Sequence, residues 1–297
     1  MSLGDFSLNG NCNDMKLSKI ESGWFKLDGG AMFGVVPKTL WNRVNPADEN
    51  NMCTWTMRCL LIETGNRKIL VDTGMGDKQG EKFRSHFEPH GPYSLENSLS
   101  EKNLKPEDIT DVFLTHMHFD HVGGAVRRNE DGDLVPTFPN ATYWSNKEHY
   151  DWAYDPNERE RASFLKENFV PLMDHSRLEF LDLDGGDEWI KGLGVHRVHG
   201  HTEAMMLLEM DHPKRKLYYC ADLMPSAAHI KMPWVLSYDV RPLNTLKEKE
   251  FLLKKAIEED AILIFEHDHQ VECCDLTRDK RGRIAMKQSY KLEEVLS

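Results

Sequence analysis

The chain has 297 residues, of which 40% are hydrophobic, and it carries 49 acidic against 37 basic residues, for a net charge of −12. This length and apolar content allow a large buried core. The basic residues form no concentrated block, which argues against a nucleic acid or an anionic membrane surface as partner. No apolar run approaches the roughly 18 residues of a membrane span, and no secretion signal is recognisable.

The cysteine pattern indicates a reducing environment. The six cysteines show none of the paired C-x-x-C spacing of a structural zinc site. We therefore expect reduced cysteines in a cytoplasmic protein, mostly filling the core. Cys273 and Cys274, which follow a histidine cluster closely, are the only pair for which a functional thiol is an alternative.

The N-terminal third predicts strands and an apolar loop. Residues 1–15 are polar and patternless, and we expect a tail, flexible or added for expression, before a single domain over residues 16–297. A strand is predicted for residues 16–27. Residues 31–51 then mix apolar residues with Gly, Pro and Asn, so this loop either folds onto the core or forms the rim of a substrate pocket.

A hairpin is predicted around Gly65 and Asn66, and its second strand ends in Asp72-Thr73-Gly74. A carboxylate at a strand end could accept a hydrogen bond from a metal-bound imidazole and so fix the orientation of the ring. The alternative for Asp72 is an Asx-type turn cap. A helix is expected over residues 94–103.

The next stretch carries the strongest chemical signal. His116, His118, Asp120 and His121 follow directly on the apolar, strand-like run of residues 112–114. Imidazole and carboxylate are the ligands that suit zinc and its first-row neighbours. The period of a strand would place His116 and His118 on one side of the chain. Because four polar groups after a buried strand each need a partner, the stretch predicts a metal site.

The second half of the chain predicts further strands and helices. A strand is expected over residues 142–144 and a helix over residues 157–169, with an apolar side. Residues 225–242 are irregular. Thr245-x-x-Glu248 resembles a capping box, which predicts a helix extending to about residue 260.

Three later apolar strands also end in metal-capable groups. Residues 195–198 precede His199 and His201, residues 217–221 precede Asp222, and residues 261–265 precede His267 and His269. Histidines that merely filled a core would not all fall at strand ends. Within each histidine pair the two residues lie two positions apart, so strand periodicity does not choose between them.

The pattern His-x-His-x-Asp-His, followed by Val-Gly-Gly, resembles the signature of the metallo-β-lactamase superfamily in its hydrolytic branch. The later strand ends match the family in order, since a Gly-His-Thr turn, an Asp closing a strand and a Phe-x-His-Asp stretch all recur. The resemblance selects His201 and His267 from the two pairs, and it favours Asp72 as a residue that orients a metal ligand. It implies an α/β fold, a four-layer αββα sandwich of two mixed sheets with helices outside.

The resemblance also implies a binuclear site. One ion would be held by His116, His118 and His201, the second by Asp120, His121 and His267, with Asp222 bridging the two. So many protein ligands exceed the need of one tetrahedral ion and suit a pair about 3.5–4 Å apart. We expect two divalent ions, zinc first, with manganese or iron as alternatives. A water between them would ionise near pH 7, and Asp120 could carry a proton to the leaving group.

We therefore expect a hydrolase that acts on a small-molecule ester or lactone. The sequence is similar to lactonases that open acyl-homoserine lactone rings, but Pro225 stands where they place a Tyr after the bridging Asp, and Met205 where a second His often follows the Gly-His-Thr turn. His229 and Tyr238 are candidate replacements for the Tyr. Further candidate pocket residues come from the two irregular segments: Met32, Phe33, Trp41 and Trp234.

Three other functions are alternatives to this hydrolase. A mononuclear iron dioxygenase acting on a thiol also occurs in the superfamily. A phosphodiesterase is disfavoured by the acidic charge, and a non-catalytic, metal-stabilised binding protein is disfavoured by the complete ligand set. The expected partner is a small molecule, with neither nucleic acid nor membrane, and a homodimer is compatible with the sequence.

Overall fold

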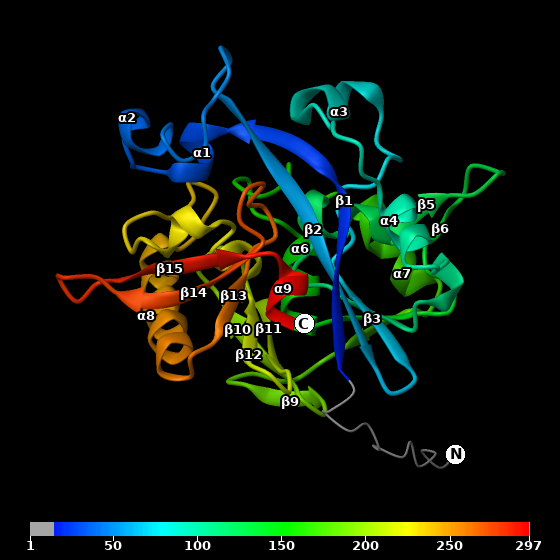
Figure 1. Ribbon diagram of the computed structural model, residues 1–297. Coiled ribbons are helices and arrows are strands. Elements are labelled where there is room, and N and C mark those ends of the chain that lie inside the picture. The colour runs from blue at the N-terminus through cyan, green and yellow to red at the C-terminus, as the bar shows by residue number, and fades with distance from the viewer. Residues whose placement is uncertain (1–14, 297) are drawn as a thin grey trace.

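The chain folds into two β-sheets that pack against each other, with helices on the outer faces (Figure 1). The computed structural model describes residues 15–296. The predicted αββα sandwich is thus confirmed. The tail expected for residues 1–15 lies almost wholly outside the described residues, and Met15 is buried against the core.

The first sheet is mixed. Its strands run in the order β1 (Lys16–Asp28), β2 (Met52–Thr64), β3 (Arg67–Val71), β4 (Asp111–Phe113), β7 (Thr142–Ser145) and β8 (Leu178–Phe180). The turn at Gly65 and Asn66 joins β2 to β3 as an antiparallel hairpin, as predicted. From β3 to β8 neighbouring strands are parallel, which requires crossover connections over a face of the sheet.

The second sheet is mostly antiparallel. Its strands run in the order β15 (Ile284–Tyr290), β14 (Cys273–Arg278), β13 (Ile262–Ile264), β12 (Lys216–Tyr219), β11 (Met205–Asp211), β10 (Leu193–Val198) and β9 (Asp187–Ile190). Only β12 and β13 pair in parallel, and helix α8 (Pro242–Glu258) is their crossover. A separate small hairpin is formed by β5 (Val126–Arg128) and β6 (Leu134–Pro136).

The other helices are short. They are α1 (Gly29–Phe33), α2 (Lys38–Trp41), α3 (Glu81–Phe87), α4 (Leu95–Glu101), α5 (Phe119–Val122), α6 (Lys147–Tyr154), α7 (Val170–Asp174) and α9 (Leu292–Leu296), with 3-10 turns η2 (Pro106–Asp108), η3 (Gly123–Ala125), η4 (Lys166–Asn168), η5 (Ala221–Leu223) and η6 (Ala227–Ile230). Within residues 15–296, none of the helices combines the length and the apolar character that a bilayer crossing requires.

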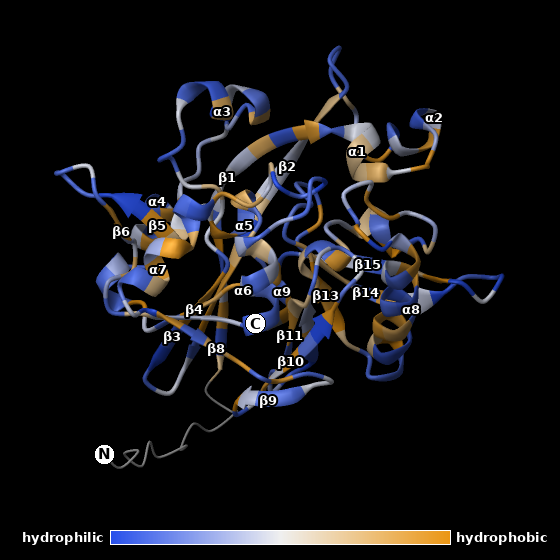
Figure 2. Ribbon diagram, turned by 180° about the vertical axis from the view of Figure 1, so that it is seen from behind, coloured by the Kyte–Doolittle hydropathy of each residue, from blue (hydrophilic) through white to orange (hydrophobic). Residues whose placement is uncertain are grey.

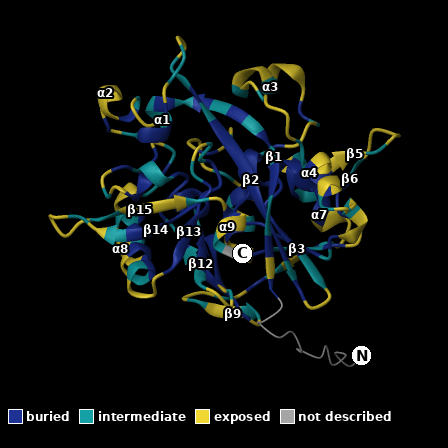
Figure 3. Cartoon of the chain, in the orientation of Figure 1, coloured by how far each residue is buried: buried dark blue, intermediate teal, exposed yellow. Residues whose placement is uncertain are grey.

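Three hydrophobic clusters hold the layers together. One lies between the sheets, where Val71 and Phe113 of the first sheet meet Leu207 of the second. Another lies between the first sheet and helices α4, α6 and α7. The third joins α1 and α2 to the ends of β1 and β2. The central strands are accordingly apolar and buried, whereas the hairpin tips are polar and exposed, and α3 contains no buried residue (Figures 2 and 3).

The helix predicted over residues 157–169 does not form. The segment consists of turns and the short η4. The Asn157 side chain accepts hydrogen bonds from the amides of Arg159 and Glu160, and such local bonds favour a turn over a helix.

Helix α8 also differs at its start. It begins at Pro242 and not at the predicted capping box of Thr245 and Glu248, because proline suits the first helical position. The Glu248 carboxylate instead accepts hydrogen bonds from the amides of His199 (2.7 Å) and Gly200 (3.0 Å). The helix thereby holds the turn between β10 and β11.

Candidate metal centre

Four segments bring side chains together at one edge of the sandwich. His116, His118, Asp120 and His121 lie in the turn after β4 and at the start of α5, His201 in the turn between β10 and β11, Asp222 in η5, and His267 directly after β13. Each of these side chains is buried. Because the segments all follow core strands, the sheet registers determine where the side chains meet.

The side chains form overlapping groups. Ligand atoms of His116, His118 and His201 lie within 4.8 Å of one another, and so do those of Asp120, His121 and His267. Asp222 lies between the groups, with Oδ2 3.2 Å from His201 Nε2 and Oδ1 3.0 Å from His267 Nε2. A carboxylate that bridges two cations requires this placement of its two oxygens.

The imidazole nitrogens show that the cluster suits cations. The Nδ1 of His267 lies 2.6 Å from the carbonyl oxygen of Thr56, to which it can only donate, so in the neutral ring its Nε2 carries the lone pair. That Nε2 is 3.1 Å from Nε2 of His121, and Nε2 of His201 is 3.2 Å from Nδ1 of His118. Two imidazole nitrogens at such distances need a proton or a metal cation between them, because their lone pairs would otherwise repel. The donor set of imidazoles and carboxylates therefore fits first-row divalent ions.

The outer nitrogens of the ligands also have partners. Nδ1 of His201 lies 3.0 Å from Asp239, and Nδ1 of His121 lies 3.1 Å from both Asp72 and Glu266. These carboxylates orient the rings and select which nitrogen faces the centre. Asp72 was singled out from the sequence, and it also accepts hydrogen bonds from the amide and the hydroxyl of Thr115.

Sequence reasoning missed several of these partners. Asp239 lies in an irregular segment without a pattern, and Glu266 is the unspecified residue of Phe-x-His-Asp. Glu160, whose Oε1 is 3.6 Å from Nε2 of His118, falls in the helix that does not form. The buried His149 accepts from the amide of Met117 (2.8 Å) and supports the ligand turn. No local signal marks any of the four.

The electrostatics of the centre favour bound positive charge. Burial acts to raise the pKa of Asp222, but the neighbouring His267 and His121 hold it well below its usual range. Burial likewise acts to raise the pKa of Glu160, yet the neighbouring His118 and a hydrogen bond from Thr202 lower it to about 2. Both carboxylates are therefore ionised at neutral pH.

A cavity of about 440 Å³ opens over the ligands. Asp120, Asp222 and His267 are among the side chains that line it, and its remaining walls are both apolar and polar: Leu27, Met32, Phe87, Phe119, Arg159, Glu160, Ser163, Ser237 and Tyr238. Of the predicted pocket residues, only Met32 and Tyr238 lie on this wall.

The other predicted pocket residues lie behind the wall, which corrects the expectation. Phe33, Trp41 and Trp234 are buried in the cluster around α1 and α2, where Phe33 stacks on Trp41 and on His229. Both ring nitrogens of His229 are used, by Ser226 Oγ and by the carbonyl oxygen of Met32, each at 2.8 Å. His229 thereby holds the backbone of Met32.

The other candidate cysteines and histidines belong to none of the ligand groups described above. Cys273 and Cys274 are buried in β14, and burial raises the pKa of Cys273 to about 12, so neither thiol is readily ionised. His199 pairs with Glu203 at 2.5 Å. His269 is half-buried on the loop after β13.

The family assignment follows from a match over most of the chain. Residues 58–267, which include every predicted metal ligand, match the family model described as Metallo-beta-lactamase superfamily. The chain belongs to the metallo-beta-lactamase superfamily. The chain is also similar to known proteins in sequence and in fold.

An N-acyl homoserine lactonase of Bacillus cereus is 26% identical over 246 residues, which cover 77% of this chain and 86% of the relative. A probable metal-dependent hydrolase from Staphylococcus aureus superposes with a TM-score of 0.82 at 27% identity, over 94% of this chain and 99% of the other. The dizinc quorum-quenching lactonase AidC, at 22% identity, shares the fold with a TM-score of 0.75 over 95% and 98% of the two chains. This metallo-beta-lactamase chain is accordingly a hydrolytic enzyme, which excludes the non-catalytic alternative.

Proposed function

We propose that the protein is a binuclear metal-dependent hydrolase that opens a lactone or cleaves an ester in a neutral small molecule with an apolar portion. The observation that carries the proposal is the pair of ligand groups joined by Asp222 on the floor of an open cavity. The lactonases among its relatives support a lactone as substrate.

The residues fit two ions of the same kind. His116, His118 and His201 would hold one, Asp120, His121 and His267 the other, and Asp222 both. The dizinc centre named for AidC supports zinc. When bound, such a pair lowers the pKa of a shared water to about 7 and polarises the substrate's carbonyl oxygen. Because ligands come from both sheets, we further propose that residues 16–297 act as one domain.

Asp120 would transfer a proton, and Tyr238 would donate a hydrogen bond to an oxygen atom of the substrate. Asp120 lines the cavity, where its carboxylate could pass a proton to the leaving oxygen. Tyr238 lines it as well, and its hydroxyl has no hydrogen-bond partner among residues 15–296. Burial and the charges of Asp120, Asp28 and Asp222 raise the pKa of Tyr238, so it stays protonated and able to donate. It is thus our candidate for the role of the Tyr that Pro225 replaces.

Other wall residues favour a neutral substrate with an apolar part. Leu27, Met32, Phe87 and Phe119 form an apolar wall beside the polar floor. In a pocket of this kind the apolar wall buries the apolar part of the ligand, and the polar groups orient its polar part. Arg159 donates to the carbonyl oxygens of Ser237 and Asp239 and so fixes the segment that carries Tyr238.

We place the enzyme in the cytoplasm. The five cysteines within the described residues are all free. Unpaired, buried thiols are typical of proteins kept in a reducing compartment.

The proposal is tested with zinc-loaded protein and a panel of lactones, aryl esters, phosphodiesters and β-lactams. We expect about two metal ions per chain, hydrolysis of a lactone or an ester, loss of activity with a chelator, and its return with zinc or manganese. His121→Ala should lose mainly one ion. Occupancy that stays near one in the intact protein would contradict the binuclear centre, and cleavage of phosphodiesters alone would contradict the substrate class.

A further inference from the structure

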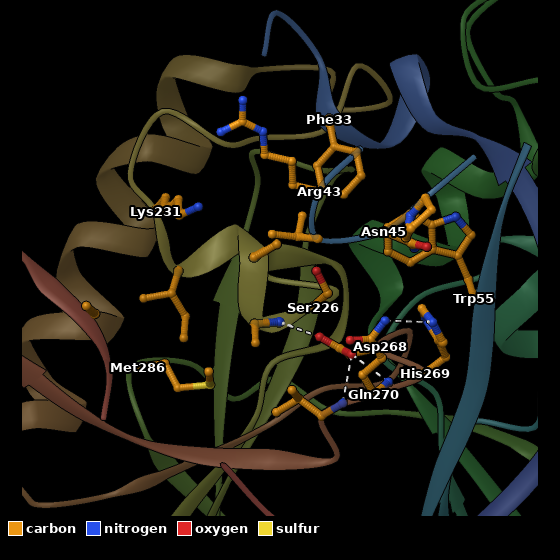
Figure 4. Close-up of a pocket in the computed structure, with 17 residues that line it drawn as sticks. Phe33, Arg43, Asn45, Trp55, Ser226, Lys231, Asp268, His269, Gln270 and Met286 are labelled. Carbon is orange, nitrogen blue, oxygen red and sulfur yellow. Dashed lines mark hydrogen bonds between the residues drawn. The ribbon is translucent and has the colours of Figure 1, made fainter. Parts of the chain in front are cut away.

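A second pocket lies on the other side of the cluster formed by α1 and α2. Its volume is about 550 Å³, and it shares no lining residue with the metal cavity. Its walls come from residues 43–46, residues 226–231, the loop of residues 268–271 and strand β15 (Figure 4). Pockets of about 300–1,000 Å³ are the size at which proteins bind small molecules.

The wall of this pocket is largely apolar and partly open to solvent. Phe33, Ile230 and Val271 contribute to it, and two further side chains, Val44 and Met286, are 36% and 42% exposed. Apolar side chains that gather at an open concave site indicate a ligand with an apolar portion.

The charges at the pocket favour an anion. Arg43 and Lys231 lie at the same side of the view in Figure 4. Neither forms an ion pair with an acidic group among residues 15–296, although the chain as a whole is acidic. Lys231 instead lies over the ring of Trp234, with Nζ 4.0 Å from the ring centroid. Two cations without counter-charges are thus available to a ligand.

The one carboxylate that lines the pocket is held by backbone amides. Asp268 accepts hydrogen bonds from the amides of Ala227 (3.0 Å), Gln270 (2.9 Å) and Val271 (2.8 Å). In Figure 4 it lies with its loop on the side opposite Arg43. The buried indole N–H of Trp55, another wall residue, has no partner among the described residues. The pocket therefore offers donors and positive charge to an anionic head group.

We propose that this pocket is a binding site for an amphiphilic carboxylate, with its chain against the apolar wall and its head group near Arg43 and Lys231. The inference does not depend on which substrate the metal cavity accepts. The loop that carries Asp268 follows His267 directly, so a ligand in this pocket could also change hydrolysis at the metal centre. The test therefore measures binding of the ligand and not enzyme activity.

The test titrates the zinc-loaded full-length protein with decanoate by calorimetry, beside decyltrimethylammonium as a probe of opposite charge. We expect decanoate to bind and the cation not to bind. Arg43→Gln combined with Lys231→Gln should weaken decanoate binding about fivefold, the order expected for two partly exposed charges. Lys280→Gln combined with Arg281→Gln, at the exposed tip between β14 and β15, removes the same charge and should leave the affinity unchanged.

Amide NMR shifts then locate the ligand. Decanoate should shift the amides of Ala227 and Gln270, and Ala285→Trp, which fills the pocket from β15, should abolish those shifts, whereas Ser289→Trp on the same strand should not. Shifts confined to Ser163 and Ser237 would place decanoate in the metal cavity and overturn the proposal. Equal weakening in both charge variants, or an absence of binding, would overturn it as well.

Discussion

Three imidazoles at the candidate centre, those of His121, His201 and His267, use their two nitrogens differently. In each, one nitrogen faces the other ligands, and the second lies beside an oxygen of Asp72, Asp239 or the Thr56 backbone. Such outer bonds fix the tautomer and the orientation of the ring before an ion binds. Affinity for the metal is thus expected to depend on residues that would never touch it.

Asp72→Asn should weaken metal binding by about 10–100-fold, because the carboxylate of Asp72 orients His121 and the charge is lost at nearly constant shape. Competition with a chelating dye measures the change. Asp111→Asn is the matched control, a buried carboxylate at the start of β4 that pairs with Arg67 and Trp144. If Asp72→Asn lowers only stability, on the order of 1 kcal/mol, Asp72 is a turn cap and no more.

Tyr238→Phe should lower kcat about 100-fold with little change in KM, the effect of removing one donor to an oxygen that gains charge in the transition state. Steady-state kinetics on the best lactone or ester of the panel measures it. Tyr154→Phe, an exposed tyrosine on α6, should be neutral. An unchanged kcat in Tyr238→Phe would remove Tyr238 from the reaction and leave the metal centre standing.

At the scale of elements, close backbone contacts position the ligand turns. Gly200 leaves no room for a side chain, because a Cβ there would overlap Thr245 of α8. Glu248 of the same helix binds the amides of His199 and Gly200. The helix therefore places the turn that presents His201, although it contributes no ligand itself.

Gly123→Ala should destabilise the fold by about 1–3 kcal/mol, the usual cost of overpacking, because its Cβ would overlap the backbone of Met75. Urea unfolding measures the loss, and the bound zinc should decrease with it, since α5 carries Asp120 and His121. Gly80→Ala, where a Cβ would meet nothing within 4 Å, is the control. Equal stability of the two variants would show that the segment can move without cost.

At the scale of the molecule, buried carboxylates should determine the response to acid. Burial acts to raise the pKa of Glu209, but hydrogen bonds from His196, Lys216 and Lys255 lower it well below its usual range. The pKa of Glu160 is lowered from 4.5 to about 2. With folded pKa values below the unfolded ones, the stabilisation is complete above pH 4.5 and is lost as the pH falls toward 2.

The melting temperature should therefore fall steeply below about pH 4.5. Glu209→Gln should flatten part of that slope, since Glu209 lies among cations far along β11 from the metal centre. Metal release at low pH affects the variant and the wild type alike. The difference between their melting temperatures at each pH therefore reports the contribution of Glu209. Parallel curves for the two proteins would show that Glu209 does not contribute to acid unfolding.

The sequence by itself determined the strand ends that carry the candidate ligands, and its resemblance to the superfamily implied the fold class. Strand ends can be read locally, because buried strands are apolar and short and the polar group that follows each one stands out. The hairpin at Gly65 was predicted from such a local pattern, whereas the choice of His201 and His267 came from the resemblance to the superfamily.

Only the tertiary structure decided which residues face the substrate and which support the ligands. An apolar side chain in a loop looks the same whether it forms a cavity wall, like Met32, or the layer behind it, like Trp41. Asp239 and Glu160 reach ligands that lie about 40 positions away in the sequence. Such pairs arise from the packing of distant segments, and no periodicity along the chain encodes that packing.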